Sequence, residues 1–99
     1  MRIENDKLLS IFGLCKKAGK LGLGRDAVKA AVMSNTAKCI FLAKDASANH
    51  EKEFAYLSQT VPLKRLECTM DDFYFAIGKK VGVISVNDEN FMKLLKFGG

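Results

Sequence analysis

The stretch from residue 19 to residue 27 holds the residues whose types and spacing could perform chemistry. It reads Gly-Lys-Leu-Gly-Leu-Gly-Arg-Asp-Ala, and the glycines at 19 and 24 have the separation found in a phosphate-binding P-loop. That loop requires Lys and then Ser or Thr after its last glycine, to hold the γ-phosphate and the magnesium ion. Arg25 and Asp26 stand there instead. A carboxylate in the cradle would repel the phosphate, so the sequence argues against a P-loop.

Two other kinds of site fit the same stretch. Gly22, Gly24 and Ala27 match the looser dinucleotide fingerprint, and Asp45 lies close to the offset of the ribose-binding acid. That motif follows a strand, however, whereas residues 8–17 carry a helical pattern. Alternatively, Gly24 opens a helix whose free N–H groups and positive dipole end attract anions. The neighbouring lysines favour this anion site over a glycine that is only a permissive N-cap.

We find no catalytic or metal-binding pattern elsewhere in the sequence. His50 is the single imidazole, in a polar stretch, and is predicted to be a solvated surface residue. Asp71 and Asp72 are adjacent and would diverge by about 100° on a helix, so they cannot face each other. Three widely spaced cysteines and one histidine do not form a zinc site, and we expect buried, reduced thiols at Cys15, Cys39 and Cys68. The sequence predicts no enzyme, no metal and no cofactor.

Positive charge is concentrated in one part of the chain. Sixteen Lys and Arg against eleven Asp and Glu give a net charge of +5, yet residues 16–44 alone hold seven bases and one acid, or +6. Residues 51–99 balance seven bases with seven acids. Solubility alone would intersperse the signs. The asymmetry favours an anion-binding face, with a solvated face that lacks a partner as the alternative.

Length and composition indicate how these residues are organised. Ninety-nine residues, 48% hydrophobic and 27% charged, are typical of a single globular domain, here residues 1–99. The longest apolar run, residues 39–43, is far shorter than the roughly 20 residues of a membrane-spanning helix. The first residues also lack an apolar signal segment. We therefore expect a cytoplasmic protein without a membrane partner.

Alternating helical and extended patterns predict the elements that position the site. Expected caps are Asn5 or Asp6, Ser47, a Thr69–Asp72 capping box and Asp88, with Gly19 as a stop. Most of the aromatic residues fall at inward positions and are expected in the core. Helices are predicted over 6–18, 24–35, 47–60, from 69 through 77 and from 88 to 95, with strands over 20–23, 38–43, 63–66 and 81–86. This alternation predicts an α/β fold, a three-layer α/β/α sandwich with a mixed sheet of about four strands.

Several segments in order resemble the kink-turn-binding ribosomal protein family. They are Gly-Leu-Cys-Lys-Lys-Ala-Gly-Lys at 13–20, Gly24, Ala-Lys-Cys-Ile-Phe-Leu-Ala-Lys-Asp-Ala-Ser at 37–47 and Ala-Ile-Gly-Lys at 76–79. The family includes the archaeal multifunctional large-subunit protein and the eukaryotic thirty-e protein, and the chain most resembles its small bacterial, ribosomal-protein-like members over residues 5–96. The resemblance implies the same sandwich fold and binding to sharply bent RNA loops with sheared G·A pairs, recognised by shape.

The resemblance also implies which elements contact RNA. The second helix would place its N-terminus in the widened groove, and an apolar loop before the last strand, here Val81, would pack on the protruding nucleotide. The family signature requires Asn or Lys, Glu or Gln, and Lys where this sequence has Asp26, Ala27 and Ala30. Lys29 lies one residue before the position of the signature lysine. Because a good bidentate base contact contributes about 1–3 kcal/mol of discrimination, these departures predict a weakened kink-turn preference.

We therefore expect a non-enzymatic protein that binds structured RNA, ribosomal or kink-turn-like, and not DNA. About six phosphate contacts would give a log–log salt slope of about −4 to −5. The alternative is a protein-interaction module on the same fold that has lost kink-turn specificity. The third hypothesis, a nucleotide-binding enzyme, is supported only by the glycine spacing. The expected RNA-binding residues are Lys16, Lys17, Lys20, Gly24, Arg25, Asp26, Lys29, Lys44, Lys79, Lys80 and Val81.

Overall fold

The computed structural model describes residues 2–57 and 61–95, and within these ranges it has five helices and four strands. The sheet has the order β1-β4-β2-β3, in which only β2 and β3 are parallel neighbours. The elements are α1 (Arg2–Lys17), β1 (Leu21–Leu23), α2 (Arg25–Met33), β2 (Cys39–Leu42), α3 (Ala48–Leu57), β3 (Leu63–Arg65), α4 (Met70–Ile77), β4 (Val83–Val86) and α5 (Glu89–Leu95).

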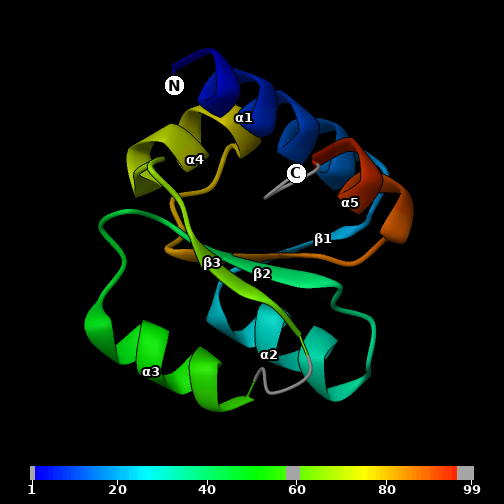
Figure 1. The fold of residues 1–99 in the computed structure, drawn as a ribbon, viewed down its shortest axis with the longest axis vertical. Helices are drawn as coiled ribbons and strands as arrows, with labels where there is room; N and C mark the ends of the chain where they lie inside the picture. Colours follow the sequence, from blue (N-terminus) through cyan, green and yellow to red (C-terminus); the bar gives the residue numbers. More distant parts are fainter. Residues whose placement is uncertain (1, 58–60, 96–99) are drawn as a thin grey trace.

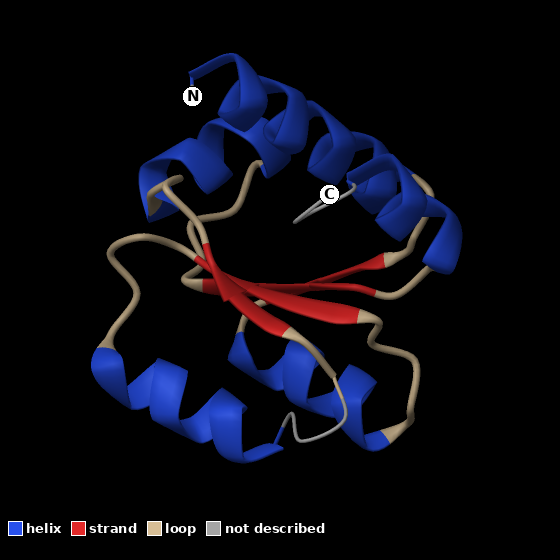
Figure 2. Cartoon of the chain, in the orientation of Figure 1, coloured by secondary structure: helices blue, strands red, loops and turns tan. Residues whose placement is uncertain are grey.

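Two helical layers enclose the sheet. Helices α2 and α3 cover one face, and α1, α4 and α5 cover the other (Figures 1 and 2). The two central strands, β2 and β4, are buried at every position because both of their faces are covered. The predicted three-layer α/β/α sandwich with a mixed four-stranded sheet is therefore confirmed.

Aromatic packing joins the layer of α1, α4 and α5 to the sheet. The ring of Phe12 in α1 lies 5.3 Å from that of Phe41 in β2 and 6.1 Å from that of Phe73 in α4. All three rings are fully buried, so this cluster holds α1 and α4 side by side on the sheet. The expectation that the aromatic residues are mostly core is wrong for Tyr56, Tyr74 and Phe75, whose helical positions face solvent.

Most predicted caps are confirmed. The Ser47 hydroxyl accepts from His50 N at 3.1 Å, Thr69 and Asp72 form both hydrogen bonds of a capping box, and Asp88 accepts from Asn90 N at 2.7 Å. Gly19 ends α1 with a φ of 72°. The prediction of an N-cap at Asn5 or Asp6 is wrong, because α1 begins at Arg2. Acidic side chains in the first turns of a helix are stabilised by its dipole, so they need not mark its boundary.

Two further predictions are wrong. β4 begins at Val83 and not at residue 81, although the Gly82 carbonyl still accepts from Ala43 N just before the strand. Leu94 was expected to face inward but is 54% exposed on the outer side of α5. The predicted end of the third helix near Thr60 lies outside the described residues.

Candidate nucleic-acid interface

One end of the sheet brings together segments that are distant in sequence. Leu23 pairs with Ile84, and Leu42 pairs with Val83. As a result, the residue that follows β1, the loop that follows β2 and the loop that precedes β4 meet at the same end. We call it the Gly24 end. It contains Gly24 with the first turn of α2, the loop at residues 43–47 and the loop at residues 78–82.

Gly24 has a backbone that only glycine adopts readily. Its φ of 89° and ψ of 170° lie in a region that is essentially closed to residues with a side chain. Its N–H donates to the Val83 carbonyl at 3.0 Å, and its own carbonyl accepts from Val28 N in the first turn of α2. No side chain caps this helix at Gly24. The start of α2 is therefore attached directly to the sheet.

The half-buried side chain of Val81 lies next to this helix start. A Cβ atom placed on Gly24 would be 3.6 Å from Val81 Cγ1, which is ordinary van der Waals contact. The apolar loop residue and the helix N-terminus thus form one continuous surface. Both were predicted as site residues from sequence, and tertiary structure makes them neighbours.

Arg65 fixes the second loop of the Gly24 end, and the sequence analysis missed it. One guanidinium nitrogen, Nη1, donates to the carbonyls of Ala43, Lys44 and Ala46 at 3.2, 2.9 and 3.3 Å. The other, Nη2, forms a 2.8 Å ion pair with Glu51. Nothing in the local sequence indicates this clamp, because Arg65 lies about twenty residues from the carbonyls it binds.

Two more contacts anchor the same loop. Lys44 N donates to the Cys68 carbonyl at 2.7 Å, and the Asp45 carboxylate accepts from Met70 N at 2.9 Å. Asp45 thus caps α4 and is not a ribose ligand, which removes the remaining support for the dinucleotide fingerprint. The exposed Lys44 is held at the Gly24 end by this network.

Three of the predicted RNA-binding cations have partners within the protein. Arg25 forms two 2.8 Å hydrogen bonds with Glu53 of α3, which raise the pKa of the guanidinium and lower the pKa of the carboxyl. Lys80 pairs with Asp71 at 3.2 Å. Lys16 donates to the carbonyl of Ile77 at 2.7 Å, across from α1 to the last turn of α4. Arg25 and Lys80 would have to release a carboxylate to bind a phosphate, whereas Lys16 keeps its charge and two further N–H donors.

The remaining predicted residues divide between two locations. Asp26, Lys44 and Lys79 are exposed at the Gly24 end. Lys20 lies at the opposite end of the sheet, since its carbonyl accepts from Asn87 N just after β4. Lys17 is exposed in the last turn of α1, and Lys29 is half-buried in the second turn of α2. The structure therefore separates Lys17 and Lys20, at the end of α1 and just after it, from the residues at the Gly24 end.

His50 differs from its prediction as a solvated residue. It is half-buried at the Gly24 end, with its ring centroid 6.5 Å from that of Phe54. Its Nδ1 would be 3.7 Å from a Cβ atom on Gly82. The imidazole therefore packs close to the backbone of Gly82, where a methyl group would only touch it.

The thiols of the three cysteines lie in the core. All three are buried and free, as predicted, and burial raises the pKa of each thiol from 9.0 to about 11. Within residues 2–57 and 61–95, no three His, Cys, Asp or Glu residues are grouped to hold a metal ion. Nor does any helix in those ranges have the length and apolar character needed to cross a membrane.

A mixed four-stranded sheet between two helical layers, with a glycine-opened second helix beside an apolar loop, defines a small three-layer α/β/α domain. The chain is 31% identical over 94 residues to "RNA-binding protein YlxQ" of Enterococcus faecium. The aligned region covers 94% of this chain and 91% of that protein. It belongs to the YlxQ family. This confirms the predicted resemblance at the level of a ribosomal-protein-like bacterial protein.

A solved structure has the same fold. It is that of a protein of unknown function from Bacillus halodurans C, which is 30% identical and superposes with a TM-score of 0.81 over 90% of this chain and 92% of that one. No protein-family model matches the chain.

Proposed function

We propose that this protein is a non-catalytic, cytoplasmic RNA-binding protein whose single domain binds structured RNA at the Gly24 end. The name of the Enterococcus faecium relative, an RNA-binding protein, supports RNA binding in general. The observation that carries the proposal for this site is the contact between the start of α2 at Gly24 and the side chain of Val81.

These two features suit a bent RNA. A helix N-terminus without a side-chain cap presents N–H groups and a positive dipole end to a phosphate or a base edge. An adjacent apolar side chain can pack on a base that has left the stack, and RNA loops and bulges offer such bases. Lys44 and Lys79, both exposed at this end, would neutralise the backbone.

The same surface lowers the expected specificity for a kink-turn. Asp26, Ala27 and Ala30 are exposed on α2. Their short side chains cannot make the base-edge contacts that the longer residues of the family signature provide. We therefore propose binding to bent, structured RNA, ribosomal RNA included, with a kink-turn preference weaker by about 1–3 kcal/mol for each missing bidentate contact.

The structure also changes the expected salt dependence. Arg25 is paired with Glu53, and Lys16, Lys17 and Lys20 lie in or just after the last turn of α1, which leaves Lys44 and Lys79 of the six cations that the sequence suggested. Two phosphate contacts give a log–log slope of about −1.4 to −1.8, in place of −4 to −5.

The test is a titration at several salt concentrations with two RNA hairpins. One contains a kink-turn, and in the other Watson–Crick pairs replace its G·A pairs. We expect salt-dependent binding to both with a modest preference for the kink-turn. The double variant Lys44→Ala, Lys79→Ala should weaken binding, and Lys93→Ala on the distant α5 should not. Failure to bind either RNA, or equal effects of the two variants, would contradict the proposal. The first result would favour the protein-interaction alternative.

A further inference from the structure

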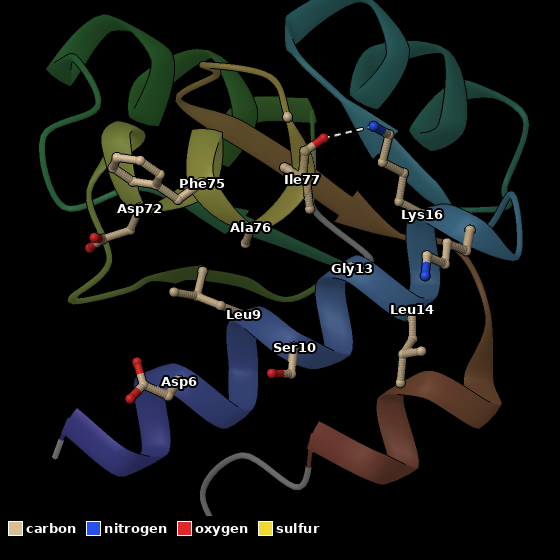
Figure 3. Close-up of a pocket in the computed structure, with 12 residues that line it drawn as sticks. Asp6, Leu9, Ser10, Gly13, Leu14, Lys16, Asp72, Phe75, Ala76 and Ile77 are labelled. Carbon is tan, nitrogen blue, oxygen red and sulfur yellow. Dashed lines mark hydrogen bonds between the residues drawn. The ribbon is translucent and has the colours of Figure 1, made fainter.

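A groove with a volume of about 1000 Å³ lies between α1 and α4, in the layer that faces away from α2 and α3 (Figure 3). The two helices approach closely along its floor, where a Cβ atom on Gly13 would be 3.5 Å from the Ala76 carbonyl. Leu9 and Ala76 are half-buried beside it. A side chain at Gly13 would therefore come into contact with the backbone of α4 across the floor of the groove.

Apolar side chains on the rim remain exposed after folding. Phe75 is 85% exposed and Leu14 is 55% exposed. Tyr74, 52% exposed, lies next to Phe75 with the ring centroids 6.0 Å apart. Large apolar side chains gathered around a concave surface are a mark of an interaction site, whereas single exposed apolar residues are ordinary.

The groove has opposite charges at its two ends. α1 and α4 run in the same direction, since Lys16 near the end of α1 reaches Ile77 at the end of α4. Asp6 and Asp72 lie at the end where α4 begins, and Lys16 and Lys17 lie at the other. In Figure 3 the Phe75 ring lies toward Asp72, and Leu14 lies toward Lys16.

We infer that this groove is the interface of a two-fold symmetric dimer of the chain. A two-fold axis through the centre of the groove reverses its direction in the second copy, so each feature meets the one at the opposite end. The acidic end of one copy then faces the basic end of the other, and Phe75 faces Leu14. A partner with a single sign of charge would match only one end. The groove residues do not include Gly24 or Val81, so this inference does not depend on the proposed RNA site.

Sedimentation equilibrium of the full chain over a micromolar to millimolar range tests the dimer directly. We expect a reversible monomer–dimer equilibrium that Phe75→Ser weakens tenfold or more. Tyr56→Ser, which removes an aromatic ring 76% exposed on α3, is the matched control and should leave the equilibrium unchanged. A wild-type chain that stays monomeric throughout overturns the inference and leaves the groove to another partner. So does an equal effect of the two variants.

Charge reversal identifies the symmetry of the interface. Asp6 and Lys17 are both exposed, so Asp6→Lys and Lys17→Glu should fold normally, which circular dichroism can verify. Alone, each variant places like charges opposite one another and should be mostly monomeric. An equimolar mixture restores opposite charges at both ends and should form a heterodimer. Dimers of either variant alone, or a mixture that stays monomeric, would contradict the two-fold arrangement.

Discussion

Arg25 at the start of α2 and Glu53 in α3 are joined by two parallel 2.8 Å hydrogen bonds, from Nε and Nη2 to the two carboxylate oxygens. This bidentate ion pair ties together the two helices that cover one face of the sheet. It also neutralises the one guanidinium beside Gly24. An RNA phosphate that binds Arg25 must therefore compete with the Glu53 carboxylate, which occupies the same guanidinium donors.

Replacing Glu53 by Gln should strengthen RNA binding. The change releases Arg25 and removes a negative charge from the Gly24 end, so we expect an affinity gain of about two- to five-fold and a salt slope steeper by about 0.7–0.9. Titration at several salt concentrations measures both. Glu89→Gln removes the same charge from the distant α5 and should change neither. Weaker binding by the Glu53 variant would show that Arg25 needs its partner to be oriented.

Replacing Gly24 by Ala should lower both stability and RNA affinity. At a φ of 89° and ψ of 170° the new side chain is strained by about 1–3 kcal/mol, which denaturant unfolding measures. Gly19→Ala is the control, because its φ of 72° is also left-handed and nothing lies within 4 Å of an added Cβ. It should cost about 1–2 kcal/mol without reducing RNA affinity. Equal losses of affinity in both variants would mean that general destabilisation, and not the helix start, is responsible.

Gly22 and Ser85 should be energetically coupled across β1 and β4. A Cβ atom on Gly22 would be 2.5 Å from Ser85 Oγ, a side chain that is fully buried. We expect Gly22→Ala to cost about 1–3 kcal/mol from overpacking, and part of this cost to disappear when Ser85→Ala removes the hydroxyl. The double variant should therefore be more stable than the sum of the single effects predicts. Strict additivity in a double-mutant cycle would contradict this.

Removing the Arg65 clamp should destabilise the protein and loosen Lys44. Arg65→Ala removes one donor from each of three loop carbonyls and from Glu51, and the partial exposure of the side chain limits the expected loss to about 1–2 kcal/mol. Lys52→Ala, an exposed cation on α3, should have almost no effect on unfolding. If the clamp positions Lys44, then Lys44→Ala should reduce RNA affinity less in the Arg65→Ala background than in the wild type.

The three thiols should be unreactive in the folded protein. Because burial raises the pKa of each from 9.0 to about 11, almost no thiolate is present near pH 8, and a disulfide reagent should modify all three only after unfolding. Between pH 9 and 11 the unfolded chain releases thiol protons that the folded chain retains. The free energy of unfolding should therefore fall as the pH rises through this range. Rapid labelling of the native protein at pH 8 would contradict the burial of the cysteines.

Local sequence patterns were sufficient to predict the helices and strands. The apolar run that ends at Ala43 suited a strand covered on both faces, and Thr69 with Asp72 specified a helix start through hydrogen bonds only three residues apart. Such signals are short-range, so the chain near each residue contains the information. The α/β/α class follows from their alternation.

Contacts between distant segments could not be predicted in the same way. The sequence indicated Gly24, Val81 and Arg25 as candidates, but it could not show that Gly24 adjoins Val81, that Glu53 binds Arg25, or that Lys20 lies at the opposite end of the sheet. Those relationships depend on the strand order and register, in which β4 pairs with both β1 and β2. Arg65 is the clearest example, since an arginine on a short strand has no local partner.

The amino-acid sequence by itself thus determined the elements, most of their caps, the buried thiols and a surplus of positive charge near the second helix, because each depends mainly on residues a few positions apart. Only the tertiary structure decided which of those charges remain available. Long side chains reach partners wherever the fold places a carboxylate or a carbonyl, as Glu53 meets Arg25 and Ile77 meets Lys16. The same packing left Phe75 exposed beside an open groove, since α4 buries Phe73 and Ile77 against the rest of the domain and turns Phe75 outward.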